Sequence, residues 1–412
     1  MPSLKRVTDF LGLRKSIVGL LGMVILVGMG EKMAERFLPI YLLALGGGAL
    51  SIGLLSSLDD LLSALYSFPG GYLSDSIGRK RALLVFNLMA MTGYAIVIVI
   101  PAWQAVILGA VLFLSWTAIS LPATISLVAK VLPQNKRAMG VSMHSLVRRI
   151  PMALGPIIGG TLIGLWGEST GMRIAFGAAL LMAGVGLVMQ QILIEEDRKG
   201  PGGKPDTVPQ KNLFRVLART SPGLRNLLVS DILVRFCERI PYGFVVVWSM
   251  KVITQSVSGL QFGILTAIEM VTAMLIYIPV AYLAGRTRKK PFVAITFGFF
   301  TLFPLALLFS DSFGLLAAAF VLRGLKEFGE PTRKALIMDL APEDQKAATF
   351  GAYYLARDVI VAAAGVGGAY LWTISPATNF LVAFGFGVLG TLWFALRGRD
   401  LQSAGEAKLT TD

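Results

Sequence analysis

The sequence predicts an all-α polytopic membrane protein, with twelve transmembrane helices in two six-helix bundles that are related by pseudo-two-fold symmetry. Three observations predict this fold class: the apolar composition, a series of long apolar segments and an internal repeat. Of the 412 residues, 55% are hydrophobic and 15% are charged, and the mean hydropathy is +0.70. A soluble domain has about 45–50% apolar and about 25% charged residues, and single soluble cores stop growing at about 250–300 residues. We therefore expect lipid to cover most of the apolar surface.

Long apolar segments follow one another along the chain, and a transmembrane helix needs about 17–25 predominantly apolar residues. The predicted spans of the first half are 16–46, 49–74, 82–101, 104–130, 138–165 and 172–193, and those of the second half are 226–250, 259–285, 291–310, 313–338, 347–372 and 377–396. Between the halves lies a stretch rich in Pro, Gly and charge, which is typical of a linker. The predicted domains are an N-terminal bundle (1–193), a cytoplasmic linker (194–225), a C-terminal bundle (226–396) and a cytoplasmic tail (397–412).

Basic residues gather in alternate loops, which predicts the orientation. Residues 79–81, 130–137 and 286–290 carry most of these cations, and the opposite loops have little besides Arg173 and Lys251. Because cytoplasmic loops are enriched in Lys and Arg, we expect both termini in the cytoplasm and a multi-pass protein of the bacterial inner membrane. The first apolar run is longer than the about 7–15 residues of a signal-peptide core, so we expect no removable signal peptide. The loop placement also explains the net charge of +14 without a nucleic-acid partner.

The two halves repeat one another in several places. Matching positions occur in the same order: Glu35-Arg36 with Glu238-Arg239, Gly53 and Asp59 with Gly263 and Glu269, Arg149 with Arg357, and Gly159-Gly160 with Gly367-Gly368. Such a parallel repeat predicts a pseudo-two-fold axis along the membrane normal and a solute site between the halves near the midplane.

The segment after the second predicted span carries a spaced motif of Gly71, Asp75, Gly78, Arg79 and Lys80. This spacing resembles the signature loop of the major facilitator superfamily, and the layout of six plus six spans extends the resemblance over the whole chain. The resemblance implies a secondary transporter that works by alternating access, not an enzyme, in which Asp75 and Arg79 form a conformational latch. Residue chemistry agrees, because glycine allows close helix approach and a carboxylate favours a helix N-terminus.

Two further segments resemble subfamily motifs in part. Gly155, Pro156, Gly159 and Gly160 match the core of a motif of drug:proton antiporters. Glu35-Arg36 resembles part of a signature of proton-coupled peptide transporters. The first resemblance implies proton-coupled efflux of a small organic solute. The second keeps open a proton-coupled importer of a peptide-like or anionic metabolite.

Ionisable residues in the predicted spans are candidates for the transport site, because each costs about 2.5–3.5 kcal/mol at the bilayer centre on insertion scales. A proton-driven carrier needs a carboxylate whose protonation changes as a cation or a substrate group approaches. The proton-coupling candidates are Glu31, Glu35, Asp59 and Asp60. The substrate-cavity candidates are Arg36, Arg149, Glu238, Arg239, Glu269, Arg323, Lys326, Glu327, Glu330 and Arg357. Charges that recur in both halves have an alternative interpretation as structural ion pairs inherited by each copy.

Other function classes find less support in the sequence. A single His and a single Cys give no His/Cys metal site, and no Walker-type loop predicts ATP drive, so we expect no cofactor and no metal. A transport-dead receptor of the same fold stays an alternative, although no segment is long enough for a soluble output domain of about 50 residues. We expect a monomer that carries a small solute with protons, and sodium is the rival coupling ion.

Overall fold

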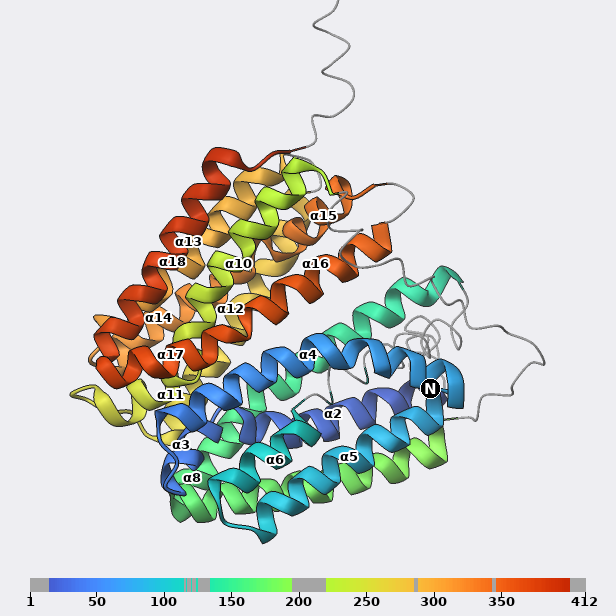
Figure 1. The fold of residues 1–412 in the computed structure, drawn as a ribbon. Helices are drawn as coiled ribbons and strands as arrows, with labels where there is room; N and C mark the ends of the chain where they lie inside the picture. The colour runs from blue at the N-terminus through green and yellow to red at the C-terminus, as the bar shows by residue number, and fades with distance from the viewer. Residues whose placement is uncertain are drawn as a thin grey trace, which may run out of the picture. The chain divides into compact units, whose positions relative to one another are not determined.

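The computed structural model describes residues 15–114, 116, 120, 124, 134–194, 220–284, 288–342 and 346–400, and this part of the chain is built from helices (Figure 1). Within it, eight helices are both long and apolar enough to cross a membrane. One of them, α8 (Gln134–Leu193), is interrupted at Gly167, where the backbone is not helical. The described residues therefore fold as the all-α membrane protein that composition predicts.

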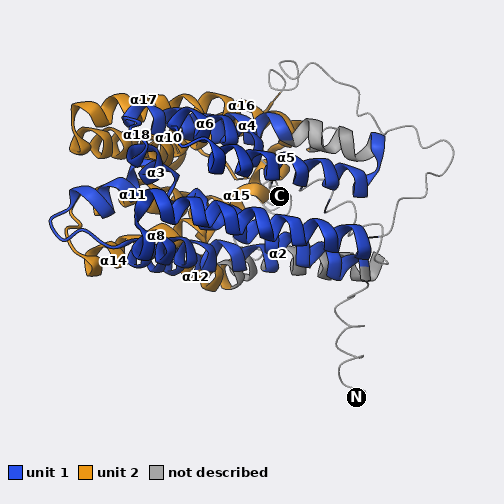
Figure 2. Cartoon of the chain, turned by 90° about the horizontal axis from the view of Figure 1, so that it is seen from below, with its two compact units in different colours: residues 1–206, 243–270 blue, residues 207–242, 271–412 orange. Residues whose placement is uncertain are grey.

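The chain divides into two compact units, which Figure 2 colours separately. The first unit comprises residues 1–206 and 243–270. Its helices are α2 (Lys15–Glu35), α3 (Leu38–Ala44), α4 (Ala49–Ile77), α5 (Arg79–Val99), α6 (Trp103–Phe113), α8, α11 (Phe244–Val247), a π-helical turn η1 (Trp248–Val252) and the first part of α12 (Gly259–Ala284). Helix α8 packs along α2 and also contacts α5 and α3.

The second unit comprises residues 207–242 and 271–412. It contains α10 (Pro222–Tyr242), the rest of α12, α13 (Lys289–Leu308), α14 (Phe313–Leu325), a 3-10 turn η2 (Lys326–Gly329), α15 (Glu330–Leu340), α16 (Lys346–Val361), α17 (Ala363–Ile374) and α18 (Pro376–Arg397). Helix α10 contacts α13, α15, α16, α17 and α18, so it packs against most helices of this unit (Figure 1).

Residues 243–270 group with the first unit because of close backbone packing and an ion pair. A Cβ atom at Gly160 would lie 2.0 Å from the carbonyl oxygen of Gly259, so only glycine fits there. Lys251 forms an ion pair with Glu168 in the same unit. This grouping reports packing, whereas the division at residues 193 and 226 rests on the sequence repeat and stays a prediction.

Several predicted spans contain a break. Predicted span 16–46 is divided into α2 and α3, and span 226–250 into α10, α11 and η1. Span 313–338 is divided by the 3-10 turn η2, and span 347–372 at Ala362. A stretch of 3-10 helix inside a longer helix often marks a functional hinge. The break in the first span includes Arg36 of the repeated Glu-Arg pair, and the break in the seventh span comes four residues after Arg239.

Local chemistry explains where several helices begin and end. Gly78 separates α4 from α5 and has a φ of 92°, in the region that favours glycine. Helix α18 begins with Ser375 as its N-cap, whose hydroxyl accepts a hydrogen bond of 2.9 Å from the backbone N–H of Thr378. Pro376 then occupies the first turn, where its missing N–H costs nothing.

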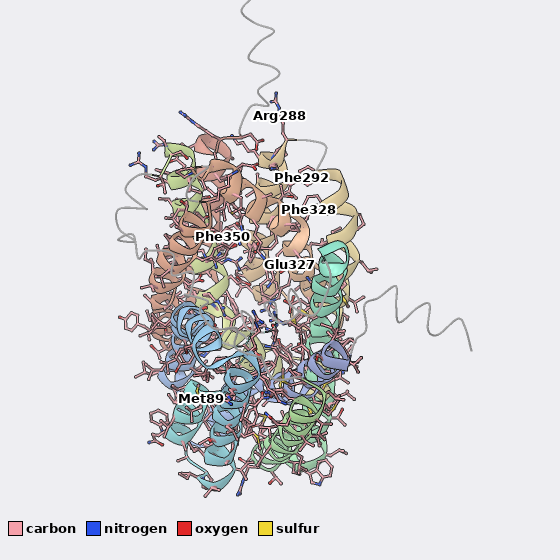
Figure 3. All side chains as sticks on the ribbon, turned by 90° about the vertical axis from the view of Figure 1, so that its right-hand side faces the viewer. Met89, Arg288, Phe292, Glu327, Phe328 and Phe350 are labelled. Atoms are coloured by element: carbon pink, nitrogen blue, oxygen red, sulfur yellow. The ribbon has the colours of Figure 1, made fainter. Side chains whose placement is uncertain are left out.

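Each unit has an apolar core. In the first unit, the rings of Tyr94, Phe113 and Phe176 pack with centroids 5.1–6.0 Å apart. In the second unit, Phe292 of α13 stacks on Phe328 of η2 with centroids 5.5 Å apart (Figure 3). These rings fix the helices that carry the charged side chains described next.

Candidate functional site

In the first unit, a lysine bridges two carboxylates on α2. Lys32 Nζ lies 3.1 Å from an oxygen of Glu31 and also forms an ion pair with Glu35. Glu31 is 2% exposed, so its carboxylate is almost completely buried. Tyr94 and Arg148 lie close enough to Glu31 to interact electrostatically with it. The structure thus pairs two predicted proton-coupling residues with the same cation, Lys32. Lys32 was not among the site residues predicted from sequence.

A second ion pair of this unit joins two of the predicted cavity residues. Arg36, in the break between α2 and α3, lies 3.8 Å from a carboxylate oxygen of Glu269, whose side chain is 0% exposed. Asp59 and Asp60 lie on α4, where Asp59 is half-buried and Asp60 is buried. Buried charges in apolar surroundings persist only when they are paired or reach water.

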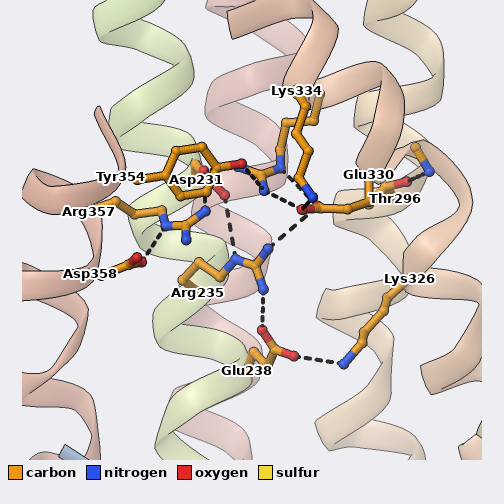
Figure 4. A network of polar contacts seen from close by, with 12 residues as sticks. Asp231, Arg235, Glu238, Thr296, Lys326, Glu330, Lys334, Tyr354, Arg357 and Asp358 are labelled. Atoms are coloured by element: carbon orange, nitrogen blue, oxygen red, sulfur yellow. Dashed lines mark hydrogen bonds and ion pairs between the residues drawn. The ribbon is translucent and has the colours of Figure 1, made fainter. Parts of the chain in front are cut away.

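The second unit holds a larger charged network, centred on Asp231 of α10 (Figure 4). Asp231 is 1% exposed, and its Oδ2 atom accepts hydrogen bonds from Arg333, from Arg357 at 3.3 Å and from the Tyr353 hydroxyl at 3.0 Å. Arg235 approaches the other oxygen at 3.8 Å. One carboxylate on α10 therefore joins side chains from α15 and α16.

Arg235 extends the network toward η2. Its guanidinium lies 2.6 Å from Glu238 and 3.5 Å from Glu330 (Figure 4). Glu238 also accepts a hydrogen bond of 2.8 Å from Lys326, and Glu330 accepts two from Arg333, at 2.7 and 3.0 Å. Glu238 of α10 is thus placed in one network with Lys326, the first residue of η2, and Glu330, the first residue of α15.

Two further cations of this unit, Arg239 and Arg323, contact aromatic rings. The guanidinium carbons of Arg239 and Arg323 lie 4.6 and 5.5 Å from the centroid of the Tyr242 ring. Arg323 is 3% exposed and also lies over Phe303 and Phe320, at 5.0 and 5.7 Å. A guanidinium over an aromatic ring is stabilised by the ring's negative face, most strongly where water is excluded.

Sequence reasoning did not select Asp231, Arg235 and Arg333, which form the centre of the network. A signal for two of them was available, since Asp231, Arg235 and Glu238 lie on one face of a helix at i, i+4 and i+7. Arg333 also has a local partner in Glu330, three residues earlier, but its contact with Asp231 joins residues that are 102 apart in sequence. Arg357 was selected, and it contacts both Asp231 and Asp358.

Part of the predicted latch lies among residues whose side chains the structure does not describe. Gly71 and Asp75 belong to α4, and only their backbone is described. Lys80 is held within the first unit: its Nζ atom donates to the Gln191 carbonyl at 2.7 Å, and its own carbonyl accepts from Gln190 at 2.8 Å. Gln190 in turn accepts from Asn87 at 2.6 Å, in the buried interior. A chain of hydrogen bonds therefore fixes the first turn of α5.

The antiporter-like segment of α8 lies where backbones approach closely. A Cβ atom at Gly159 would lie 2.0 Å from the carbonyl oxygen of Met33, and one at Gly155 would lie 2.8 Å from the Cβ atom of Lys32. These glycines therefore bring α8 directly against the part of α2 that carries the Glu31 cluster.

The sequence profile of the Major Facilitator Superfamily matches residues 20–248 and 232–410. The chain belongs to the major facilitator superfamily. It is therefore a multi-pass membrane transporter that carries small molecules, and not an enzyme, as the spaced motif and the repeat predict. The two matching segments also agree with a fold of two helical bundles.

Individual members of the superfamily resemble the chain to different extents. An uncharacterised MFS-type transporter of Methanocaldococcus jannaschii is 23% identical over 364 residues, which cover 86% of this chain and 87% of that protein. The multidrug resistance protein MdtG of a Rahnella species is 31% identical over 202 residues, and the match covers about half of each chain, 47% and 46%. The crystal structure of the nucleoside transporter NupG superposes with a TM-score of 0.77 at 14% identity, covering 93% of this chain and 100% of that one. This last likeness concerns the fold alone.

Proposed function

We propose that this chain is a secondary active transporter that couples efflux of a small organic solute to proton entry by alternating access. The observation that carries the proposal is the buried Glu31, paired with Lys32 near the C-terminal end of the apolar helix α2. An ionisable residue inside a membrane is costly and by default indicates an ion or substrate pathway. The likeness of half the chain to a multidrug resistance protein supports the direction of transport.

In this proposal Glu31 is the residue that gains and loses the proton. While Glu31 is ionised, it shares the Lys32 ammonium with Glu35. When Glu31 binds a proton, its attraction for Lys32 is lost, and the lysine then interacts with Glu35 alone. Arg148 also lies close enough to interact electrostatically with Glu31, so a displacement of Arg148 or Lys32 changes the charges that surround this carboxylate. Asp59 and Asp60 are the next candidates for this role.

Asp231, Arg235 and Arg333, at the centre of the charged network, are assigned to the scaffold of the site in this proposal. Arg36, Glu238, Arg239, Glu269, Arg323, Lys326, Glu327, Glu330, Arg149 and Arg357 are retained as cavity candidates. Gly71, Asp75, Gly78, Arg79 and Lys80 are proposed to act on the balance between conformations. We further propose cytoplasmic termini, a monomer, and an N-terminal bundle (1–193) that is joined to the C-terminal bundle (226–396) by the linker.

The test begins with a thermal-shift screen of a metabolite and drug library on the purified full-length protein. A ligand found in this way is then loaded into proteoliposomes, and its release is followed with and without an imposed pH gradient. We expect release of the loaded ligand to accelerate when the medium outside the proteoliposomes is more acidic than their interior. This dependence on the pH gradient should be lost when a protonophore is added. Release that ignores the pH gradient in both directions but follows a sodium gradient would replace the proton by sodium in the proposal.

A further inference from the structure

The end of α10 and the end of α14 place two arginines on one tyrosine. Arg239 and Tyr242 occupy the last turn of α10, and Arg323 lies in the last turn of α14, just before the break at η2. The two guanidinium carbons are 4.6 and 5.5 Å from the centroid of the Tyr242 ring. Phe303 and Phe320 hold Arg323 from further sides.

Ring contacts and hydrogen bonds use different parts of a guanidinium. The ring attracts the delocalised positive charge, whereas the N–H donors point outward along the edge in a rigid fork that matches a carboxylate. An arginine fixed on an aromatic ring is therefore already ordered for binding an oxyanion and loses less side-chain freedom when it does so. Arg239 and Tyr242 are half-buried, so this arrangement is partly open, while Arg323 is buried.

The charge balance of the surrounding segments favours an anionic ligand. Residues 231–239, 323–334 and 357–358 contain seven cationic side chains (Arg235, Arg239, Arg323, Lys326, Arg333, Lys334 and Arg357) but five acidic ones (Asp231, Glu238, Glu327, Glu330 and Asp358). Lys334 is 50% exposed, and without it the set still has one cation more than it has acids. Side chains of predominantly one sign attract a ligand of the opposite sign, which here is an anion.

We propose that Arg239, Tyr242 and Arg323 form a binding site for an organic anion that carries a carboxylate next to a flat aromatic group. The two arginines bind the carboxylate, and the exposed part of the Tyr242 ring packs against the flat group. Lys326, at the break of span ten, is paired with Glu238 at 2.8 Å, so the two arginines supply the positive charge of this site. This inference rests on the proposed transport function, because it names the chemical class of the solute.

The test uses equilibrium dialysis of the purified full-length protein with three matched probes: 2-naphthoate, the neutral 2-naphthamide and the cationic 2-naphthylmethylammonium. We expect naphthoate to bind about tenfold or more tightly than either isostere, since hydrogen bonds between charged partners outweigh neutral ones. Arg239→Gln and Arg323→Gln should each weaken naphthoate binding by about tenfold or more, while binding of naphthamide changes little.

Two variants keep the test decisive. Arg397→Gln is the matched control, because Arg397 lies over the Trp393 ring at 4.3 Å in the same unit but at the end of α18, and it should change no affinity. Arg323→Lys keeps the charge of a buried residue and should bind naphthoate more tightly than Arg323→Gln does. Melting temperatures of all variants separate lost binding from lost folding. If Arg323→Gln does not fold, the test rests on Arg239→Gln, because Arg239 is only half-buried.

The proposal is overturned if naphthamide binds as tightly as naphthoate, if naphthoate does not bind at millimolar concentration, or if Arg239→Gln weakens both probes equally. None of these measurements needs a proton gradient. Charge-selective binding without gradient-driven release would therefore leave the anion site standing and refute the transport proposal. Gradient-driven release of a cationic or neutral solute would do the reverse.

Discussion

Replacing Asp231 with Asn should cost more stability than any other single acid-to-amide change in the second unit. The carboxylate is 1% exposed and accepts hydrogen bonds from Arg333, Arg357 and Tyr353. Asn keeps the shape but removes the charge that offsets two buried guanidinium groups. Removing one partner of a buried ion pair costs about 3–5 kcal/mol, which is a large part of a typical net stability of about 5–15 kcal/mol.

The measurement is a thermal unfolding curve in one detergent at one protein concentration. With about 2–4 °C per kcal/mol for a domain of about 150–250 residues, the expected fall in Tm is about 6–20 °C. Asp358→Asn is the matched control, because Asp358 is 25% exposed and contacts Arg357 at 2.7 Å near the outside of the network. Its effect should stay within about 1 kcal/mol. Equal shifts for both variants would refute the central position that we assign to Asp231.

Three further predictions test other parts of the account. Gly329→Ala should lower Tm because its Cβ atom would lie 2.4 Å from a backbone oxygen of α13, whereas Gly298→Ala, which meets nothing within 4 Å, should leave Tm unchanged or raise it; equal effects would show that η2 is not tightly packed. Gln190→Leu should lower the free energy of unfolding by about 1–3 kcal/mol, because it leaves buried groups without hydrogen bonds. In a double-mutant cycle with Asn87→Leu, the stability lost by the double variant should be smaller than the sum of the two single losses. Simple additivity would show that the two residues do not act in one hydrogen-bonded chain. Arg79→Ala should slow turnover in proteoliposomes while ligand affinity measured on the purified protein is kept, and a loss of affinity at normal turnover would remove Arg79 from the latch.

The fold was predictable because apolar segments of membrane length and a repeated motif are properties of the sequence alone. The spans were predicted as continuous, however, and the interruptions were missed. Span 313–338 contains η2, which begins directly after α14 and ends at Gly329. Hydropathy averages over about one span length and does not register a change from α to 3-10 geometry. The Gly-Glu-Pro sequence at 329–331 was the available local signal.

The charged residues were predicted with mixed success for a physical reason. Glu31 and Glu35 share one helix face, so their proximity follows from helical periodicity. Lys32 lies three residues before Glu35, a spacing that also predicts their pairing, and its long side chain reaches Glu31 as well. The charged network centred on Asp231 depends on contacts between α10, α15 and α16. Such contacts follow from tertiary packing, which residue spacing within one helix does not specify.

Proton coupling through Glu31 is the central claim, and release of the screened ligand from proteoliposomes under an imposed pH gradient tests it most directly when wild type and Glu31→Gln are compared. Gln keeps the size and hydrogen-bonding capacity of the side chain but cannot titrate. The account predicts that Glu31→Gln binds the ligand with wild-type affinity and melts near the wild-type temperature, yet releases it at a rate that no longer responds to the gradient. Gradient-driven release that persists in Glu31→Gln would contradict the claim and would leave Glu31 a structural partner of Lys32.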